Sequence, residues 1–353
     1  MGLNTISAAD ALQAIDRFSA VIDARSEDEY ALDHLPGAVN WPTLTNDQRR
    51  IVGTTYKQIS AFEARKRGAA MAARNIAGHI EREVLELPAD WQPLVYCWRG
   101  GKRSGSLALI LDQVGFKVAL IEGGYKAFRA GIVADTPRLA QAVRFTVVCG
   151  PTGSGKTRLL QALAQAGAQV LDLEALACHR SSVLGQIPGV AQPSQKAFEM
   201  QVWNALRRFD PARPVFVESE SKKVGNAAVP DSVMAAMRAS PCLRLELPQE
   251  ERVALLMEDY AFFATDPELF CERLDVLAGL RGKAVVAEWQ RKVRAGETRD
   301  VVRDLLLKHY DPGYSSSIRN NFTQYGTSEL IAADDGAMRT FSQLAEKILA
   351  EQA

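Results

Sequence analysis

Cys97 is the side chain in this sequence best placed to do chemistry, because of the residues that follow it. They are Trp98, Arg99, Gly100, Gly101, Lys102, Arg103 and Ser104. Nearby cations and the start of a helix favour the thiolate, the nucleophilic form of cysteine. Backbone N–H groups of a glycine-rich loop before a helix also surround anions well. We therefore interpret Cys97 as a catalytic nucleophile and residues 99–104 as an anion cradle; an inert strand-end cysteine would not need these neighbours.

A second loop has the spacing of a phosphate-binding P-loop. The apolar stretch 145–149 leads into G-x4-G-K-T, whose candidate phosphate-binding residues are Gly150, Gly153, Ser154, Gly155, Lys156 and Thr157. The glycines let backbone N–H groups approach phosphate oxygens, Lys156 supplies a positive charge, and the Thr157 hydroxyl suits Mg²⁺. The pattern predicts diphosphate binding but leaves open what the diphosphate belongs to, because such a loop reads no base.

Carboxylates after two other apolar stretches are candidates to support phosphate or Mg²⁺. Asp172 and Glu174 follow one stretch, and Glu218 and Glu220 follow the stretch at 215–217. Carboxylates at strand ends beside a P-loop can hold Mg²⁺ directly or through water. A solvated turn explains the same residues equally well. Mg²⁺ is therefore a possible ligand, and no metal site is firmly predicted.

The elements that must position these groups alternate between helices and strands. The expected elements are helices at 8–17 and 104–114, and strands at 20–24, 94–97, 118–121 and 145–149. This alternation predicts an α/β fold of open parallel sheets with helices on both faces. We predict a first domain over residues 1–135, with a helical insertion at about 43–88. A second α/β domain is expected over 140–353, with a helical C-terminal part.

The composition limits the classes of protein that need consideration. The chain has 353 residues, enough for two domains with separate cores. No apolar run reaches ~18 residues, and no leader pattern opens the chain, so we expect neither a membrane span nor a signal peptide. The five cysteines form no C-x-x-C pair, which argues against a zinc site and fits the reducing cytoplasm.

The formal net charge is zero, so a nucleic-acid partner would have to meet a local basic surface. One candidate surface contains Arg49, Arg50, Lys57, Arg65, Lys66, Arg67 and Arg74, and another contains Arg291, Lys292, Arg294, Arg299, Arg303 and Lys308. Either set could equally form an ordinary solvated helix face. Trp98 could stack on an unpaired base, although packing explains a tryptophan beside a buried strand equally well.

The first domain resembles the rhodanese family, whose active cysteine carries a persulfide. The resemblance rests on the Cys97 loop, on Asp23-Ala24-Arg25-Ser26 with Glu29-Tyr30, on His34 to Asn40, and on Glu122-Gly123-Gly124-Tyr125. The loop from Cys97 to Arg103 reads C-x5-R, one residue longer than the common sulfurtransferase cradle. It is similar to the loop of rhodanese-like phosphatases, which implies room for a full phosphate.

Over essentially its whole length, the chain resembles the tRNA 2-selenouridine synthase family. The further matching stretches are Asp172-Leu173-Glu174 through His179-Arg180, Gln192 to Gln195 with Phe198-Glu199, Val217 to Ser221 with Gly225, and His309 to Pro312 with Tyr314. Ser181, Leu184 and Met200 stand where the family pattern has Gly, Phe and Asn, and Ser219 stands where Asp is common. These departures affect local contacts, because Cys97, Lys156 and Thr157 are intact.

The resemblance implies a transferase that replaces the sulfur of wobble 2-thiouridine in the anticodon region of tRNA by selenium. It implies selenophosphate and geranyl diphosphate as co-substrates, no tightly bound cofactor, and a selenophosphate supplier as a possible partner. The sulfur would first be geranylated at the Lys156 loop, and selenium would then be delivered from a selenyl sulfide on Cys97. The alternatives are a sulfurtransferase or phosphatase fused to a small-molecule kinase, and a non-catalytic RNA-binding module.

Overall fold

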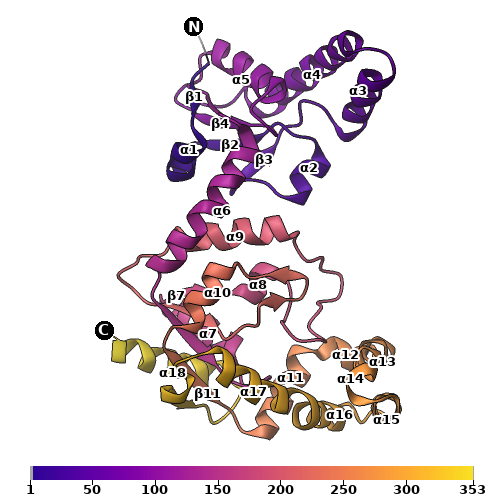
Figure 1. The fold of residues 1–353 in the computed structure, drawn as a ribbon, viewed down its shortest axis with the longest axis vertical. Coiled ribbons are helices and arrows are strands. Elements are labelled where there is room, and N and C mark those ends of the chain that lie inside the picture. The colour runs from indigo at the N-terminus through magenta and orange to yellow at the C-terminus, as the bar shows by residue number, and fades with distance from the viewer. Residues whose placement is uncertain (1–2, 353) are drawn as a thin grey trace. The chain divides into compact units, whose positions relative to one another are not determined.

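The computed structural model describes residues 3–352 and separates them into two compact units (Figure 1). The first unit contains the chain up to Pro137 together with Pro193–Asn204. The second contains Arg138–Gln192 and the chain from Ala205 onward. Each unit is built on its own five-stranded parallel sheet, as the strand–helix alternation predicts.

The sheet of the first unit has the strand order β1-β5-β4-β2-β3. Its strands are β1 (Thr5–Ile6), β2 (Ala20–Asp23), β3 (Ala38–Asn40), β4 (Pro93–Tyr96) and β5 (Ala119–Ile121). The helices around it are α1 (Ala8–Ala14), the 3-10 turn η1 (Ile15–Arg17), α2 (Glu27–Leu32), α5 (Lys102–Val114) and α6 (Gly124–Ala142). Central strand β4 is wholly buried, so the next residue, Cys97, emerges at the carboxyl edge of the sheet.

The predicted insertion is a helical hairpin formed by α3 (Asn46–Gln58) and α4 (Ala61–Glu83) (Figure 1). The Thr45 and Ser60 side chains cap the two helices by accepting hydrogen bonds from backbone N–H groups in their first turns. Few side chains of either helix are buried. The hairpin therefore presents most of its surface to solvent.

Helix α9 (Gln195–Leu206) belongs largely to the first unit although its sequence lies within the second half of the fold. The Trp203 indole N–H donates to Asp135 at 3.0 Å, and its ring packs edge-to-face on Phe128. The sequence predicts that residues 140–353 all belong to the second domain. The structure differs because Trp203 finds its apolar partner on α6, a contact between residues far apart in sequence.

The sheet of the second unit has the strand order β12-β11-β6-β8-β7. Its strands are β6 (Phe145–Cys149), β7 (Gln169–Leu171), β8 (Val215–Glu218), β11 (Cys242–Glu246) and β12 (Glu329–Ala332), and β9 (Lys223–Val224) pairs separately with β10 (Ala227–Ala228). The adjoining helices are α7 (Lys156–Gln165), α8 (Leu173–Ala177), α10 (Asp231–Arg238) and α18 (Met338–Gln352). The chain order reverses at β6, and such switch points are where open parallel sheets bind ligands.

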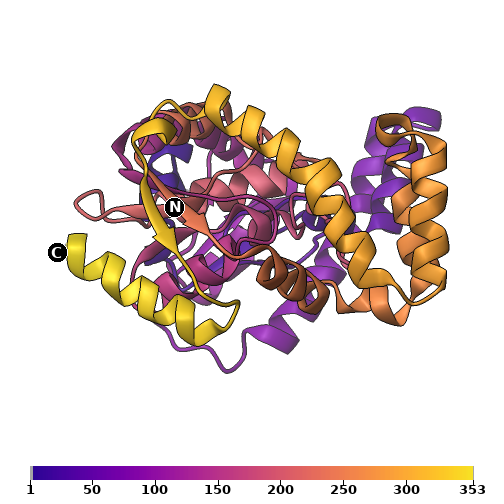
Figure 2. The same cartoon turned by 90° about the horizontal axis from the view of Figure 1, so that it is seen from below.

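A helical layer follows β11 and has its own apolar core around Phe270, Leu274 and Trp289. It consists of α11 (Gln249–Asp259), α12 (Ala261–Thr265), α13 (Pro267–Asp275), α14 (Ala278–Arg281), α15 (Lys283–Arg294), α16 (Thr298–Leu305), the π-helix η2 (Leu306–Tyr310), α17 (Asp311–Asn321) and the 3-10 turn η3 (Tyr325–Thr327). Helix α16, η2 and α17 follow one another without a break (Figure 2). Within residues 3–352, every helix is too short or too polar to span a bilayer.

Candidate active site

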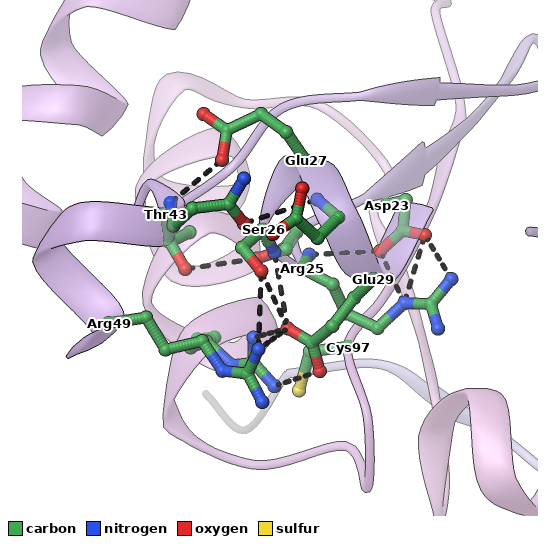
Figure 3. A network of polar contacts seen from close by, with 12 residues as sticks. Asp23, Arg25, Ser26, Glu27, Glu29, Thr43, Arg49 and Cys97 are labelled. Carbon is green, nitrogen blue, oxygen red and sulfur yellow. Dashed lines mark hydrogen bonds and ion pairs between the residues drawn. The ribbon is translucent and has the colours of Figure 1, made fainter. Parts of the chain in front are cut away.

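The Cys97 sulfur lies at the end of β4 and accepts two hydrogen bonds. The backbone N–H of Gly101 donates at 3.2 Å and the Ser104 hydroxyl at 3.0 Å. Only 3% of Cys97 is exposed, and Figure 3 shows its side chain beside the polar network that surrounds the loop. Donors aimed at a sulfur atom stabilise negative charge on it. Two members of the predicted cradle, Gly101 and Ser104, therefore contact the candidate nucleophile itself.

The shape of the loop is fixed by its contact with the start of α6. The N–H of Tyr125 donates to the Cys97 carbonyl at 2.8 Å, and the N–H of Lys126 donates to the Trp98 carbonyl at 3.1 Å. Gly100 and Gly124 have φ values of +64° and +58°. A Cβ atom at Gly124 would collide with the Cys97 carbonyl oxygen. Glycine is required at both positions because of backbone conformation and close approach.

Of the three cations in the Cys97 loop, one is paired with a carboxylate and two are exposed to solvent. Arg99 and Lys102 are exposed, whereas the Arg103 guanidinium donates to Glu29 at 2.6 Å. Burial alone would raise the pKa of Glu29, but the hydrogen bond and charge of Arg103, with the charge of Arg49, hold it below its ordinary value. The charge of Arg103 is thus already balanced. Arg99, Lys102 and the backbone N–H groups are the groups left to receive an anion.

A buried polar network behind the loop was not identified from the sequence. The Arg25 guanidinium pairs with Asp23 at 2.6 Å and donates to the Asp33 carbonyl, and both residues of this ion pair are almost wholly buried. The Tyr96 hydroxyl donates to Asp23, and the Tyr125 hydroxyl donates to Asp33. The Asp-Ala-Arg-Ser motif was the available signal, since a buried pair fixes neighbouring strand ends.

Trp98 is half-buried and stacks on Tyr125, with ring centroids 5.3 Å apart and planes inclined by 24°. Its ring is therefore packed against the first residues of α6 in this structure. Stacking on a base remains a prediction that would use the exposed part of the ring.

The P-loop of the second unit connects β6 to α7, as predicted. Gly153 and Gly155 have φ values of +77° and +87°, and a Cβ atom at Gly155 would collide with the Phe341 ring. The Lys156 ammonium donates to the Gly150 carbonyl at 2.9 Å. The Ser154 hydroxyl is buried and has no hydrogen-bond partner among the described residues. Among the described residues, the lysine donates hydrogen bonds only to neutral carbonyls, so the loop keeps donors ready for an anion.

Three carboxylates gather beside Lys156 and Thr157. Oxygens of Glu174, Glu218 and Glu220 lie within 4.8 Å of one another, and Glu218 accepts from the Thr157 hydroxyl at 2.8 Å. Burial, together with the other two carboxylates, raises the pKa of Glu174 to about 10. Burial likewise raises the pKa of Glu218 to about 8 despite the opposing charge of Lys156. A dense set of oxygen ligands that repel one another fits a divalent cation such as Mg²⁺.

Asp172 does not join these carboxylates. Its side chain accepts from the Ala175 N–H at 2.8 Å and caps α8, while Glu174 in the first turn of that helix points into the cluster. Ser181 donates to Glu220 and has a φ value of +46°, in the left-handed region. This is the position where the family pattern has glycine, so Ser181 adopts a conformation that glycine takes more easily.

A cavity of about 510 Å³ opens from the P-loop, and a neighbouring one of about 1000 Å³ shares Thr157 and Glu174 with it. The first cavity has the size of a small-molecule site, ~300–1000 Å³. Glu218, Glu220 and Lys156 line it, so the cluster of carboxylates and the P-loop face one space. That arrangement suits a diphosphate with its counter-ion.

The two predicted basic surfaces differ in their ion pairing. On the C-terminal helices, Arg291, Arg294, Arg299, Arg303 and Lys308 each contact a carboxylate. On the α3–α4 hairpin, no carboxylate of the described residues pairs with Lys57, Arg65, Arg67 or Arg74. The hairpin therefore keeps more uncompensated positive charge.

Together, the fold and these loops define a protein in which a rhodanese-like unit bearing a cysteine is joined to a P-loop unit. Comparison with known families agrees: residues 7–131 match the rhodanese-like domain, and residues 143–269 match the tRNA 2-selenouridine synthase AAA domain. The chain belongs to the tRNA 2-selenouridine synthase family, as the following relatives show.

Several proteins named tRNA 2-selenouridine synthase are similar to this chain. The protein of Alcanivorax borkumensis is 33% identical over 326 residues, covering 83% of this chain and 88% of the relative. That of Hahella chejuensis is 32% identical over 331 residues, covering 85% of each. The Nitrosomonas europaea protein is 38% identical over 248 residues, which cover 68% of this chain and 63% of the relative. The chain thus spans just under two thirds of some relatives and most of others.

Proposed function

We propose that this protein replaces the sulfur of wobble 2-thiouridine in tRNA by selenium, taken from selenophosphate, through a geranylated intermediate. One observation carries the proposal: a chain of this family holds a hydrogen-bonded cysteine loop and a P-loop with three carboxylates. The first suits chemistry on a sulfur-sized or phosphate-sized anion, and the second suits departure of a diphosphate. We expect the reaction in the cytoplasm, with tRNA as substrate. The relatives' names favour this function over a sulfurtransferase or phosphatase fused to a kinase.

We assign geranylation to the P-loop unit. The thiouridine sulfur attacks the first carbon of geranyl diphosphate, a C–S bond forms, the C–O bond breaks, and the N3 proton of the base is released. The Lys156 ammonium and the loop N–H groups would stabilise the charge that develops on the departing diphosphate. Glu174, Glu218, Glu220 and Thr157 would hold Mg²⁺, which supplies further charge neutralisation when bound.

We assign selenium transfer to the Cys97 loop, with one change to the scheme that the family resemblance implies. A selenyl sulfide on Cys97 would require selenide-level selenium to lose two electrons, and the proposed substrates include no acceptor for them. Attack of the Cys97 sulfur on phosphorus keeps the balance: the S–P bond forms, the P–Se bond breaks, and hydroselenide leaves with the electron pair. Hydroselenide then displaces geranylthiolate at C2, and water cleaves the S–P bond to phosphate. The phosphatase-like C-x5-R spacing supports this route.

The experiment separates the two steps by supplying either substrate to single variants. An anticodon stem-loop with 2-thiouridine, or the same RNA already geranylated, is incubated with the appropriate co-substrate, and its nucleosides are analysed by mass spectrometry. Lys156→Ala should slow geranylation by about 100-fold and still selenate the geranylated RNA. Cys97→Ser should geranylate normally and fail to selenate. Cys178→Ser, a half-buried cysteine of the second unit, is the matched control.

Full selenation by Cys97→Ser would overturn the assignment of that step. Intact-protein mass spectrometry after mixing with selenophosphate distinguishes the two routes on Cys97. A phosphoryl adduct supports attack on phosphorus, whereas an adduct with the isotope pattern of selenium supports the selenyl sulfide.

A further inference from the structure

The cavity that opens from the P-loop has a second wall of a different kind. The first wall carries the carboxylates, whereas the second wall carries cationic and neutral groups. The second wall comes from α10, α14, η2 and α17. Its side chains are cationic, aromatic or neutral polar: Arg238, Arg281, His309, Tyr310, Tyr314 and Asn321. The diphosphate site proposed above does not use any of them.

Arg238 and Arg281 carry charge that the described part of the protein does not balance. Neither guanidinium has a carboxylate within ion-pair distance among residues 3–352. The Arg238 Nε is buried and has no hydrogen-bond acceptor in the part of the chain that the structure describes. A buried charged donor without an acceptor is costly, and native structures rarely keep one unless a ligand or water supplies the acceptor.

Arg281 is held in place by a neutral partner. Its Nε donates to the Nδ1 of His309 at 3.0 Å, and its Nη2 donates to the His309 carbonyl at 3.2 Å. Burial and the neighbouring guanidinium lower the pKa of His309, so the ring is uncharged at neutral pH. The guanidinium is therefore oriented without being neutralised. His309 lies on the π-helix η2, and such segments occur frequently at functional sites.

The rest of the wall offers groups that suit a nucleoside. Tyr310 and Tyr314 provide aromatic rings. The Asn321 amide N–H donates to the Ser317 carbonyl at 2.8 Å, one helical turn back, which orients the amide oxygen and the Ser317 hydroxyl as further polar groups of the wall. The hydroxyls of Tyr314 and Ser219 lie near each other, but with respect to residues 3–352 neither makes a hydrogen bond of good geometry. Unpaired bases are recognised by aromatic stacking and by hydrogen bonds at their edges, and arginine forks match phosphate.

We propose that this wall binds the acceptor nucleotide, with Arg238 and Arg281 holding a phosphate ester of the RNA. The inference rests on the proposed function, since it gives the second substrate of prenyl transfer a place in the cavity that holds the first. The P-loop takes the diphosphate and the arginine wall takes the phosphodiester, so both reactants enter one space of about 510 Å³. A free nucleotide offers the same phosphate chemistry and is distinguished by the test.

Binding measurements test the proposal without requiring turnover. Titrations of the full chain use inorganic pyrophosphate with Mg²⁺, uridine 5′-monophosphate, and a fluorescent anticodon stem-loop containing 2-thiouridine at several salt concentrations. Arg238→Gln and Arg281→Gln should each weaken stem-loop binding about tenfold and reduce the salt dependence by about 0.7–0.9 per arginine. Pyrophosphate affinity should stay within about twofold. Lys156→Ala should show the reverse pattern, since it is proposed to contact only the diphosphate.

Arg213→Gln is the matched control, because Arg213 precedes β8 and so lies at the amino end of the sheet, away from the P-loop. Arg281→Lys keeps a charge and should retain most of the salt dependence. Thermal melting of each variant identifies any that fail to fold. If one of Arg238→Gln and Arg281→Gln does not fold, the stem-loop affinity of the other tests the proposal.

Unchanged stem-loop and monophosphate affinities in both arginine variants would overturn the proposal, as would an equal loss of pyrophosphate binding. Loss of monophosphate binding with unchanged stem-loop affinity would show that the site serves a free nucleotide and would overturn the RNA assignment. Arginine-dependent RNA binding in a wild-type protein that does not modify RNA would reject the proposed reaction and keep this site.

Discussion

Glu29 determines how much positive charge the Cys97 loop can offer an anion. Its carboxylate takes up Arg103 at 2.6 Å and lies 3.5 Å from Arg49, although burial opposes its ionisation. The sequence predicts the cluster of cations after Cys97, but it does not show which of them will be paired. The partner of Arg103 lies far back in the chain, in the first turn of α2, and only the folded sheet brings the two together.

We expect Glu29→Gln to lower the free energy of unfolding by about 1.5–3 kcal/mol, the usual worth of a hydrogen bond to a charged group. Because the folded pKa of Glu29 is lowered, its contribution is present above the pKa of an unfolded glutamate and is lost as pH falls through the folded value. Urea unfolding from pH 7 to pH 3 should therefore show the variant and wild type converging in acid. A difference that persists or grows in acid would contradict the electrostatic origin.

The carboxylates near the P-loop show the same limit of sequence reasoning. Asp172 and Glu174 both follow a strand, and spacing alone does not say which one faces the loop. The structure assigns Asp172 to capping α8 because its short side chain reaches the Ala175 N–H. Glu174, inside the helix, is then free to turn toward Glu218. Glu218 and Glu220 were predictable because a buried strand ends directly at a P-loop sheet edge.

Among the elements, the α3–α4 hairpin is the one whose surface is hardest to explain by packing. Tyr56, Ile59 and Phe62 are each more than 60% exposed near the turn. They lie beside Lys57 and Arg65, which pair with no carboxylate of the residues that the structure describes. Lys66 lies over the Phe62 ring at 5.1 Å. Exposed aromatic rings among cations are typical of surfaces that bind single-stranded RNA. The helices were predictable from the sequence, but the pairing of their charges was not.

We expect the triple variant Lys57→Gln/Arg65→Gln/Arg67→Gln to weaken stem-loop binding and to lower the salt dependence by about 2, close to 0.7 per lost contact. The comparison is Arg291→Gln/Arg294→Gln/Arg303→Gln, whose cations are ion-paired on the C-terminal helices. Fluorescence anisotropy at several salt concentrations measures the stem-loop affinity and its salt dependence for each triple variant. A slope for the hairpin variant equal to that of the wild type would show that the hairpin contributes no RNA contact.

At the scale of the whole molecule, two parallel α/β units and their order follow from the strand–helix alternation. What the sequence does not reveal is that the first unit is completed by a later segment. Residues 193–204 carry Trp203 to Phe128 and Asp135, so the core of the first unit includes a side chain from beyond the P-loop. No helix is expected from the sequence at residues 195–206, and only tertiary contacts show which core α9 joins.

We expect Trp203→Ala to destabilise the first unit by about 3–5 kcal/mol, the cost of removing a large buried side chain. Hydrogen exchange measured by mass spectrometry should show faster exchange in α6 and β4, while β6 and α7 remain protected. Asn204→Ala, at the next position, is the control for helix substitution. Faster exchange confined to the second unit would contradict the assignment of α9.

Because α9 belongs to the first unit but follows the P-loop in sequence, it also affects the order in which the chain folds during synthesis. A ribosome releases residues up to Pro137 well before Trp203, so the nascent cysteine-bearing sheet must wait for the P-loop segment to be made before it closes fully. Splitting the gene between the Cys97 loop and the P-loop would therefore leave the first unit without α9, and the side chain of Phe128 would lose its contact with Trp203. This layout favours keeping the Cys97 loop and the P-loop in one chain.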